Sequence, residues 1–505
     1  MPTTVASQDD TALLPSSADP LCVDLDGTLV KSDTLVDSAL ALARHHPADL
    51  LKLPGWLLQG KAALKRHLTA AVDLNVAHLP YNRQILQYLE QQHAAGRPIY
   101  LATAADSTLA QRIADHLGLF TGVIASDGTL NLAGNNKLAA FRRQFGDSGA
   151  FSYIGNALPD LPLLQHCHQP MVANPTASLR AALRSARITP VRVFNEQVSP
   201  LKAWPKAIRI HQWAKNVLIF LPLLLAHSRD RGLIAAAAVA FLSFGLCASA
   251  TYIVNDLLDL EADRQHPRKR RRPFASGDLS AITGVVVVLL FLAASAALAL
   301  AVPHIVKAVS PTLVLVPPYQ VSFFGWLCIY LVTTLAYSLR LKRAVLVDVV
   351  VLSGLYTIRI LAGSAATGVA VSTWLASFSI FFFLSLAFVK RFAELESLRE
   401  RGGDSASGRG YHVADIEQLR SFGTASGYAS VVVFTLYISN LDAAELYHHT
   451  NRLWLLVPIL LLWLSRLWLQ ASRGLLDEDP VVYAVTDKRS LLLGLLVVIV
   501  ILISL

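Results

Sequence analysis

The sequence of 505 residues is poor in cysteine and in charged residues. Its four cysteines lie far apart and form no Cys-x-x-Cys pair. Neither a disulfide framework nor a cysteine zinc site is therefore predicted. Charged residues make up 16% of the chain and hydrophobic residues 54%. This composition is too apolar for a soluble protein of this length, and it indicates membrane segments.

Two further patterns are missing. Residues 1–20 are polar and lack the charged start and apolar core of a signal peptide, so we expect a disordered cytoplasmic leader. The formal net charge is +9, but the basic residues are not interleaved with aromatic ones as they are on nucleic-acid surfaces. No nucleic-acid partner is predicted.

Apolar residues concentrate after about residue 215 and form nine segments. These lie at about 213–228, 233–254, 282–303, 312–338, 345–367, 372–389, 422–440, 452–472 and 490–505. Lys and Arg gather in alternate loops, so the positive-inside rule places those loops in the cytoplasm and the C-terminus outside. We therefore predict an all-α bundle of nine transmembrane helices over residues 211–505.

One stretch between two apolar segments, Asn255–Gly277, reads NDLLDLEADRQHPRKRRRPFASG. Its Asp256, Asp259 and Asp263 are spaced so that one helix would place them on one face. Crowded carboxylates repel one another unless a cation neutralises them, and Mg²⁺ prefers oxygen ligands. The basic run that follows suits a diphosphate. A solvated loop obeying the positive-inside rule would explain the arginines but not the three acids.

Other polar residues stand at the ends of apolar segments on the same predicted side. The stretch HQWAKN (211–216) holds the polar residues Gln212, Lys215 and Asn216. Their side chains either reach the membrane–water interface without a functional role or bind substrate. Lys342 is either a topology signal or a phosphate ligand. Asp348 lies inside an apolar segment, where an ionisable residue is a functional candidate or forms a buried pair with Arg359.

A third polar group follows the sixth apolar segment in the sequence FVKRFAELE (388–396). Lys390, Arg391 and Glu394 lie about one helical turn apart. They form either a solvated ion-pair face or a clamp for a phosphate.

The front of the chain carries polar residues at the ends of short predicted strands. The three stretches are LCVDLDGTLV (21–30), PIYLATAAD (98–106) and FSYIGNALPD (151–160). Residues at the carboxyl ends of parallel strands meet at one edge of a sheet, where α/β proteins bind ligands. A mostly helical insertion between the first two strands indicates a cap at about 33–97. We predict a Rossmann-like α/β domain.

These motifs resemble the haloacid dehalogenase (HAD) superfamily of phosphatases over about residues 19–195. The resemblance implies that Asp24 is the nucleophile and Asp26 the general acid/base. Thr103 and Lys137 would hold the phosphoryl group, and Asp160 would bind Mg²⁺. Asp24 and Asp26 would also contact the metal. The family's last motif often has an Asp where this chain has Asn156. A non-catalytic domain is therefore the alternative.

The pattern that begins with Asn255 and ends with Arg264 resembles the UbiA superfamily of intramembrane prenyltransferases, over about residues 200–505. With HQWAKN, YSLRLK and VKRFAEL, it resembles one branch in particular, the decaprenyl-phosphate phosphoribosyltransferases. UbiA prenyltransferases usually carry a second aspartate-rich motif. Here residues 337–363 hold a single acid, Asp348. This departure favours the phosphoribosyl branch over transfer of a prenyl group to an aromatic acceptor.

The resemblance implies transfer of 5-phosphoribose from PRPP to a polyprenyl phosphate in a bacterial inner membrane, toward arabinose donors for the cell envelope. Mg²⁺ on the pyrophosphate would be held by Asn255, Asp256, Asp259 and Asp263. The departing charge would be stabilised by Arg264, Lys269 and Arg272. The lipid phosphate or the ribose 5-phosphate would contact Lys342, Lys390 and Arg391.

The expected division of the chain is a leader (1–20), a HAD-like domain (21–195), a linker (196–210) and a UbiA-like domain (211–505). The front domain would remove the 5-phosphate of the product. One alternative is the prenyltransferase already named. Another is a membrane scaffold or transporter, which would need polar residues along a path through the membrane. The sequence leaves a homo-oligomer open.

Overall fold

The computed structural model describes residues 19–146, 150–196, 198–311, 321–404, 409–440, 447–476 and 480–505, so nearly all of the expected leader lies outside the described residues. The chain forms two compact units. The first comprises residues 1–207 and 253–286, and the second comprises residues 208–252 and 287–505. Each unit has its own buried apolar core.

The first unit contains a six-stranded sheet in the order β3-β2-β1-β4-β5-β6, and every pair is parallel. Its strands are β1 (Leu21–Val23), β2 (Ile99–Asp106), β3 (Gly122–Ser126), β4 (Ser152–Gly155), β5 (Gln169–Ala173) and β6 (Arg192–Phe194). All three residues of the central strand β1 are buried, which fits a sheet covered on both faces. The predicted parallel α/β domain is confirmed.

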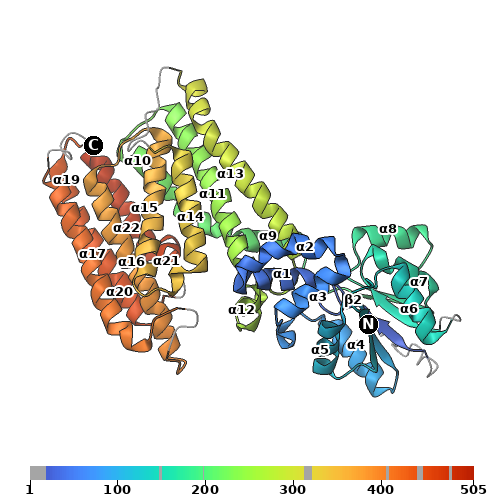
Figure 1. Cartoon of the computed structure of the whole chain (residues 1–505). Helices are drawn as coiled ribbons and strands as arrows, with labels where there is room; N and C mark the ends of the chain where they lie inside the picture. Colours follow the sequence, from blue (N-terminus) through green and yellow to red (C-terminus); the bar gives the residue numbers. More distant parts are fainter. Residues whose placement is uncertain are drawn as a thin grey trace, which may run out of the picture. The chain divides into compact units, whose positions relative to one another are not determined.

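Helices follow the strands of this sheet, and an insertion separates β1 from β2 (Figure 1). The insertion contains α1 (Thr34–His45), η1 (Pro47–Lys52), α2 (Leu53–Leu58), α3 (Lys61–Ala71), η2 (Val76–His78) and α4 (Arg83–Ala94). Later helices are α5 (Ser107–Leu117), α6 (Asn135–Phe145), η3 (Leu158–Asp160), α7 (Leu161–His166) and α8 (Ala177–Ser185), and α9 (Pro200–Ile208) ends the front part. Asp33 caps α1 by accepting from the amides of Leu35 and Val36.

The aspartate-rich segment belongs to the first unit by its contacts. The long helix α11 (Arg231–Leu258) stops before Asp259, where ψ is 12°, and α12 (Leu260–Gln265) begins directly after it. A short turn, η5 (Lys269–Arg271), follows. The expected single helix through all three aspartates is therefore wrong at Asp259, because that residue leaves helical geometry.

The second unit is a bundle of helices (Figure 1). Within the part of the chain that the structure describes, six helical stretches are long and apolar enough to cross a membrane. Four are single helices: α11, α13 (Ala281–Val309), α15 (Val347–Thr367) and α16 (Thr373–Arg399). The other two are Val413–Ile438, which contains η8 (Val413–Asp415) and α17 (Ile416–Ile438), and Thr450–Ser472, which contains α19 (Thr450–Leu453) and α20 (Leu456–Ser472). The first of them crosses from one unit into the other.

The remaining three expected segments form shorter helices. They are η4 with α10 (Ile210–Phe220 and Leu221–Leu225), α14 (Phe323–Leu339) and α22 (Lys488–Ser504). Short elements η7 (Leu341–Arg343) and α21 (Pro480–Thr486) complete the unit. The chain is thus an α/β domain followed by a multi-pass helical region. Six spans meet the length criterion among the described residues, where the sequence predicted nine.

Candidate functional sites

The predicted phosphatase residues converge at the carboxyl ends of β1 and β4. Lys137 Nζ donates to Asp24 Oδ1 at 2.8 Å and lies 3.6 Å from Asp160 Oδ1. Tyr153 supports both partners, since its hydroxyl donates to Asp160 Oδ1 at 2.7 Å and lies 3.0 Å from Lys137 Nζ. Thr103 is fully buried on the neighbouring strand β2. The parallel sheet therefore gathers residues that are far apart in the sequence.

Burial sets the electrostatics of this site. It raises the pKa of Asp24 to about 6, although the Lys137 ammonium works against the shift. Burial by itself would lower the pKa of Lys137, but Asp24 and Asp160 outweigh it and the pKa of Lys137 is raised. Lys137 therefore keeps its charge between two carboxylates. Asp24 and Asp160 facing one cation is an arrangement that also fits a divalent metal.

Asp26 lies under the insertion and is held by the start of α1. The amide of Thr34 donates to Asp26 Oδ1 at 2.7 Å. Burial, followed by the Asp33 carboxylate, raises the pKa of Asp26 to about 7. A carboxyl group with this pKa can both give and accept a proton near neutral pH. Lys65 of α3 lines the same cavity of about 10 Å³ as Asp26, a volume that holds about one water.

Asn156, which departs from the HAD pattern, packs closely against the loop after β1. Gly27 has φ +75°, and a Cβ there would lie 2.0 Å from Asn156 Nδ2. The backbone amides of Asn156 and Ala157 donate to Asp160 Oδ2 at 3.0 and 3.1 Å. Asn156 thus belongs to the wall of the site, and the turn needs glycine at position 27.

The aspartate-rich segment brings two of its three predicted carboxylates together. Arg272 Nη1 donates to Asp256 Oδ1 at 3.0 Å and to Asp263 Oδ2 at 2.7 Å. Both aspartates are buried, and burial raises the pKa of Asp263 even though Arg272 works against it. Two carboxylates that share one cationic nitrogen can share a metal ion as well. Asp259 instead pairs with Arg44, whose Nη2 lies 3.1 Å from Asp259 Oδ1.

The basic run of this segment divides into three environments. Arg264 is buried, and its Nη1 donates to Asp37 Oδ2 at 2.8 Å. Arg272 reaches the carboxylates, while Lys269 is exposed. Among the described residues, no group of three or more His, Cys, Asp or Glu side chains is arranged to hold a metal ion. Two predicted metal ligands meet around one cation at each site: Asp24 and Asp160 around Lys137, and Asp256 and Asp263 around Arg272. The roles of Asn255 and Arg264 stay predictions.

In the second unit, Asp348 is bound to Arg391. Arg391 Nε donates to Asp348 Oδ2 at 2.6 Å, and the Asp348 side chain is fully buried. The hydroxyl of Tyr411 also donates to Asp348, and Arg391 Nη2 donates to the hydroxyl of Tyr337 at 3.0 Å. Arg391 Nη1 contacts Glu394, which is exposed on its outer side. Lys342 and Lys390 are half-buried.

The alternative pairing of Asp348 with Arg359 is wrong. The two residues are eleven positions apart on α15, which is about 16 Å along a helix at 1.5 Å per residue. Arg359 Nε instead donates to Asn216 Oδ1 at 2.9 Å, and its guanidinium lies over the rings of Phe244 and Tyr330. Asn216 is thereby committed to a buried contact, and Gln212 is half-buried.

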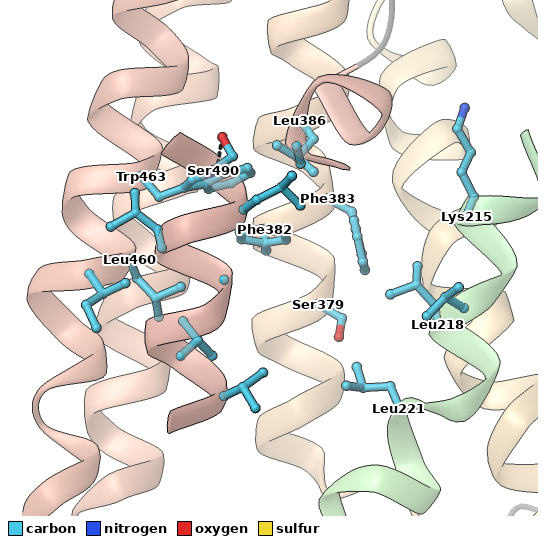
Figure 2. A pocket seen from close by; sticks show the side chains of 18 of the residues that line it. Lys215, Leu218, Leu221, Ser379, Phe382, Phe383, Leu386, Leu460, Trp463 and Ser490 are labelled. Atoms are coloured by element: carbon cyan, nitrogen blue, oxygen red, sulfur yellow. Dashed lines mark hydrogen bonds between the residues drawn. The ribbon is translucent and has the colours of Figure 1, made fainter. Parts of the chain in front are cut away.

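An apolar cavity of about 670 Å³ lies in the second unit, between η4, α16, α20 and α22. Figure 2 shows Phe382, Phe383 and Leu386 on α16 facing it. Among the described residues that line it, Lys215 is the one charged residue, and it stands at one end of the group drawn (Figure 2). Its Nζ lies 5.8 Å from the centre of the Tyr356 ring. A long apolar chain with an anionic end would match these walls.

The α/β domain carries a buried carboxylate–lysine–carboxylate site, and the helical bundle has helices long and apolar enough to cross a membrane. Together these features indicate a membrane-bound enzyme. Residues 216–482 match the model of the UbiA prenyltransferase family, which is more than half of the chain. The chain belongs to the UbiA prenyltransferase family.

Three relatives extend this result. The chain is 39% identical to an uncharacterized protein of Sinorhizobium fredii over 95% of this chain and 89% of the relative. It is 35% identical to nodulation protein NoeC of Azorhizobium caulinodans, over 59% of this chain and 92% of that protein. It is 36% identical to decaprenyl-phosphate phosphoribosyltransferase of Mycobacterium tuberculosis, over 47% of this chain and 74% of that protein.

Solved structures resemble each part at low identity. A UbiA homolog from Archaeoglobus fulgidus, bound to DMAPP and Mg²⁺, is 15% identical with a TM-score of 0.43, over 59% of this chain and 97% of that one. A HAD family hydrolase from Salmonella enterica is 14% identical with a TM-score of 0.25, over 32% of this chain and 65% of that one.

Several side chains at these sites carry no signal in the sequence. Tyr153 occupies an ordinary inward position of a buried strand, and Tyr337 and Tyr411 lie in unrelated loops and helix ends. Arg44 and Asp37 lie within an amphipathic helix of the front domain. Only their contacts in space distinguish them from other polar residues.

Proposed function

We propose that this enzyme transfers the 5-phosphoribosyl group of PRPP to a polyprenyl phosphate and releases pyrophosphate. The observation that carries the proposal is the convergence of Asp256 and Asp263 on one cationic nitrogen, in a chain of the UbiA prenyltransferase family. The 36% identity to a decaprenyl-phosphate phosphoribosyltransferase supports the choice of substrates.

In this proposal, Asp256, Asp259 and Asp263 would hold Mg²⁺, which when bound would neutralise charge on the departing pyrophosphate. Arg272 and Lys269 contact the diphosphate oxygens and stabilise the charge that develops on them. The bond from ribose C1 to the pyrophosphate oxygen breaks, and an oxygen of the lipid phosphate bonds to C1. The nucleophile is already an anion, so no strong general base is required.

The apolar cavity supports the proposed lipid substrate. Its aromatic and aliphatic walls would hold part of a polyprenyl chain, and Lys215 would contact the phosphate at the end of that chain. Asp348 and Arg391 bind each other in the interior, so we assign them to the support of the site rather than to direct phosphate contact. Lys342 and Lys390 remain the proposed partners of the ribose 5-phosphate.

We propose that the front domain is a phosphatase for the 5-phosphate of the transferred ribose. Asp24 attacks the phosphorus atom and Asp26 protonates the departing 5′ oxygen, so the bond from phosphorus to this oxygen breaks and an aspartyl-phosphate forms. A water molecule, deprotonated by Asp26, then hydrolyses the aspartyl-phosphate and releases phosphate. Asp24 and Asp160 would hold Mg²⁺, which when bound would offset the repulsion between the anions. Lys137 stabilises the phosphoryl oxygens. The cavity above Asp26 holds about one water, so the insertion has to move away to admit the substrate. Both reactions would take place on the cytoplasmic side of a bacterial inner membrane.

The decisive experiment is a donor screen with purified protein in lipid nanodiscs. Labelled PRPP or a prenyl diphosphate is supplied with polyprenyl phosphate or an aromatic acceptor, with and without Mg²⁺. We expect label from PRPP in the lipid fraction, and its loss in Asp256→Ala. Consumption of a prenyl diphosphate without dependence on PRPP would replace the proposal with an aromatic prenyltransferase.

The phosphatase is tested on the same product. Wild-type protein is expected to release phosphate from the lipid-linked ribose 5-phosphate, whereas Asp24→Asn retains the 5-phosphate and keeps the transfer step. If both proteins leave the 5-phosphate in place, the front domain does not act on this product.

A further inference from the structure

Helix α1 of the front domain binds the aspartate-rich segment through a buried ion pair. Arg264 Nη1 donates to Asp37 Oδ2 at 2.8 Å, and its Nη2 donates to Ser32 Oγ at 3.1 Å. Its Nε donates to the carbonyl of Ala275 at 3.3 Å. The Arg264 and Asp37 side chains are 6% and 2% exposed. A guanidinium this deeply buried needs its partners, so α1 fixes the position of α12.

Further contacts join the aspartate-rich segment to α1 and to the residues just before α1 and η2. Arg44, in the last turn of α1, lies 3.1 Å from Asp259, and both side chains are less than one-fifth exposed. Glu261 of α12 accepts from the amide of Asn75 at 3.3 Å. At the other end, a Cβ on Gly277 would lie 2.7 Å from Lys31 Cβ. The aspartate-rich segment therefore contacts the front domain near both of its ends, through residues 259–264 and through Gly277.

We propose that the front domain supplies two positioning residues to the aspartate-rich site. Arg44 orients the carboxylate of Asp259, and Asp37 holds Arg264, which fixes the adjacent Asp263. Metal-binding carboxylates depend on such outer partners, whose loss typically weakens metal binding 10- to 100-fold. The inference rests on the proposed metal site of the transferase. It makes the front domain a structural part of that site as well as a phosphatase.

Metal binding is measured on the full chain by titration with Mn²⁺ and electron paramagnetic resonance. All variants also carry Asp24→Asn, which weakens Mn²⁺ binding at the front-domain site. The part of the remaining Mn²⁺ signal that Asp256→Ala removes is assigned to the aspartate-rich site. We expect Arg44→Ala to lower Mn²⁺ affinity about 10- to 100-fold and Arg44→Lys to restore part of it. The matched control is Lys52→Ala, which breaks an exposed ion pair with Asp49 in the same domain.

The role of Asp37 has a separate measurement. Asp37→Asn removes the charge that holds Arg264 while keeping the shape of the side chain. We expect faster backbone hydrogen exchange over residues 259–265 than in wild type, and unchanged exchange in Lys52→Ala. Because Asn is close in shape to Asp, this variant tests the contact even if an alanine at the same position fails to fold.

The outcomes separate this inference from the proposed reaction. Unchanged Mn²⁺ affinity in Arg44→Ala, together with wild-type exchange in Asp37→Asn, would overturn it even if PRPP is the donor. Weaker Mn²⁺ binding in Arg44→Ala would support it even if the donor screen rejects PRPP. A wild-type chain without an Asp256-dependent Mn²⁺ signal would overturn both the positioning role and the metal site.

Discussion

Removing Asp348 should strongly destabilise the helical bundle. Asp348 is fully buried and accepts from Arg391 Nε at 2.6 Å and from the Tyr411 hydroxyl. Asp348→Ala would leave the buried guanidinium of Arg391 with Glu394 and Tyr337 as its remaining partners among the contacts described above. Loss of one member of a buried ion pair costs about 3–5 kcal/mol. We expect Asp348→Ala to lose that amount, and Asp348→Asn to lose less.

A double substitution separates charge burial from packing. Replacing a buried ion pair with apolar residues of similar volume is often neutral, or stabilising by about 1–4 kcal/mol. We therefore expect Asp348→Leu combined with Arg391→Met to recover most of the stability that Asp348→Ala loses. The two residues lie on α15 and α16, which pack against each other, so their single effects should not add.

Unfolding of the bundle is followed through Cys247, which is 1% exposed within α11. In a background with Cys22→Ala, Cys167→Ser and Cys328→Ser, a thiol-reactive dye reports only when Cys247 becomes accessible. The midpoint of dye reaction on heating is compared among wild type, Asp348→Ala, Asp348→Asn and the double variant. A wild-type midpoint in Asp348→Ala, with a large rise in the KM for PRPP, would refute the structural role and return Asp348 to substrate binding.

The remaining predictions concern the front domain and the lipid site. Burial raises the pKa of Asp26 to about 7, so this group favours the folded state at low pH and its contribution is lost as pH rises through 7. Without metal, we expect the stability of Asp26→Asn relative to wild type to rise by about 1–2 kcal/mol from pH 5 to pH 8, at 1.36 kcal/mol per pKa unit and allowing for partial exposure. Urea unfolding measures this difference in unfolding free energy, and the same difference between variant and wild type at both pH values would contradict the prediction. Gly27→Ala should abolish phosphate release, because Gly27 has φ +75° and an added Cβ would collide with Asn156, whereas transfer from PRPP should persist. Lys215→Ala should raise the KM for polyprenyl phosphate about tenfold, the effect of losing about 1.4 kcal/mol of binding free energy, and leave the KM for PRPP unchanged; a change confined to PRPP would move Lys215 to the other substrate.

Local sequence carries much of the front domain. The run LCV is apolar throughout and forms the buried central strand, and DLDGT places Gly27 where the turn needs a positive φ. Parallel strands bring their carboxyl ends to one edge, so the strand-end residues Asp24 and Asp160 had to come close. The apolar segments were equally clear, since a membrane span is recognised by length and hydropathy.

The sequence did not predict which charged residues pair across different helices. Asp348 could have paired with Arg359 or Arg391 as far as composition goes, and the packing of α15 on α16 selected Arg391. Helical spacing placed three aspartates on one face, but the backbone turns at Asp259, and Arg44 from the front domain meets that carboxylate instead.

Sequence alone determined that this chain joins an α/β domain to a membrane-spanning helical region and carries an acidic motif followed by a basic run. These features depend on residues near one another in the chain, whose hydropathy and spacing act locally. The basic residues looked equivalent in the sequence. Tertiary structure divided them: Arg264 is buried against Asp37, 227 positions away, Arg272 lies between two carboxylates and Lys269 remains exposed. Charge selects its partner through burial and distance, and both exist only once the chain has folded.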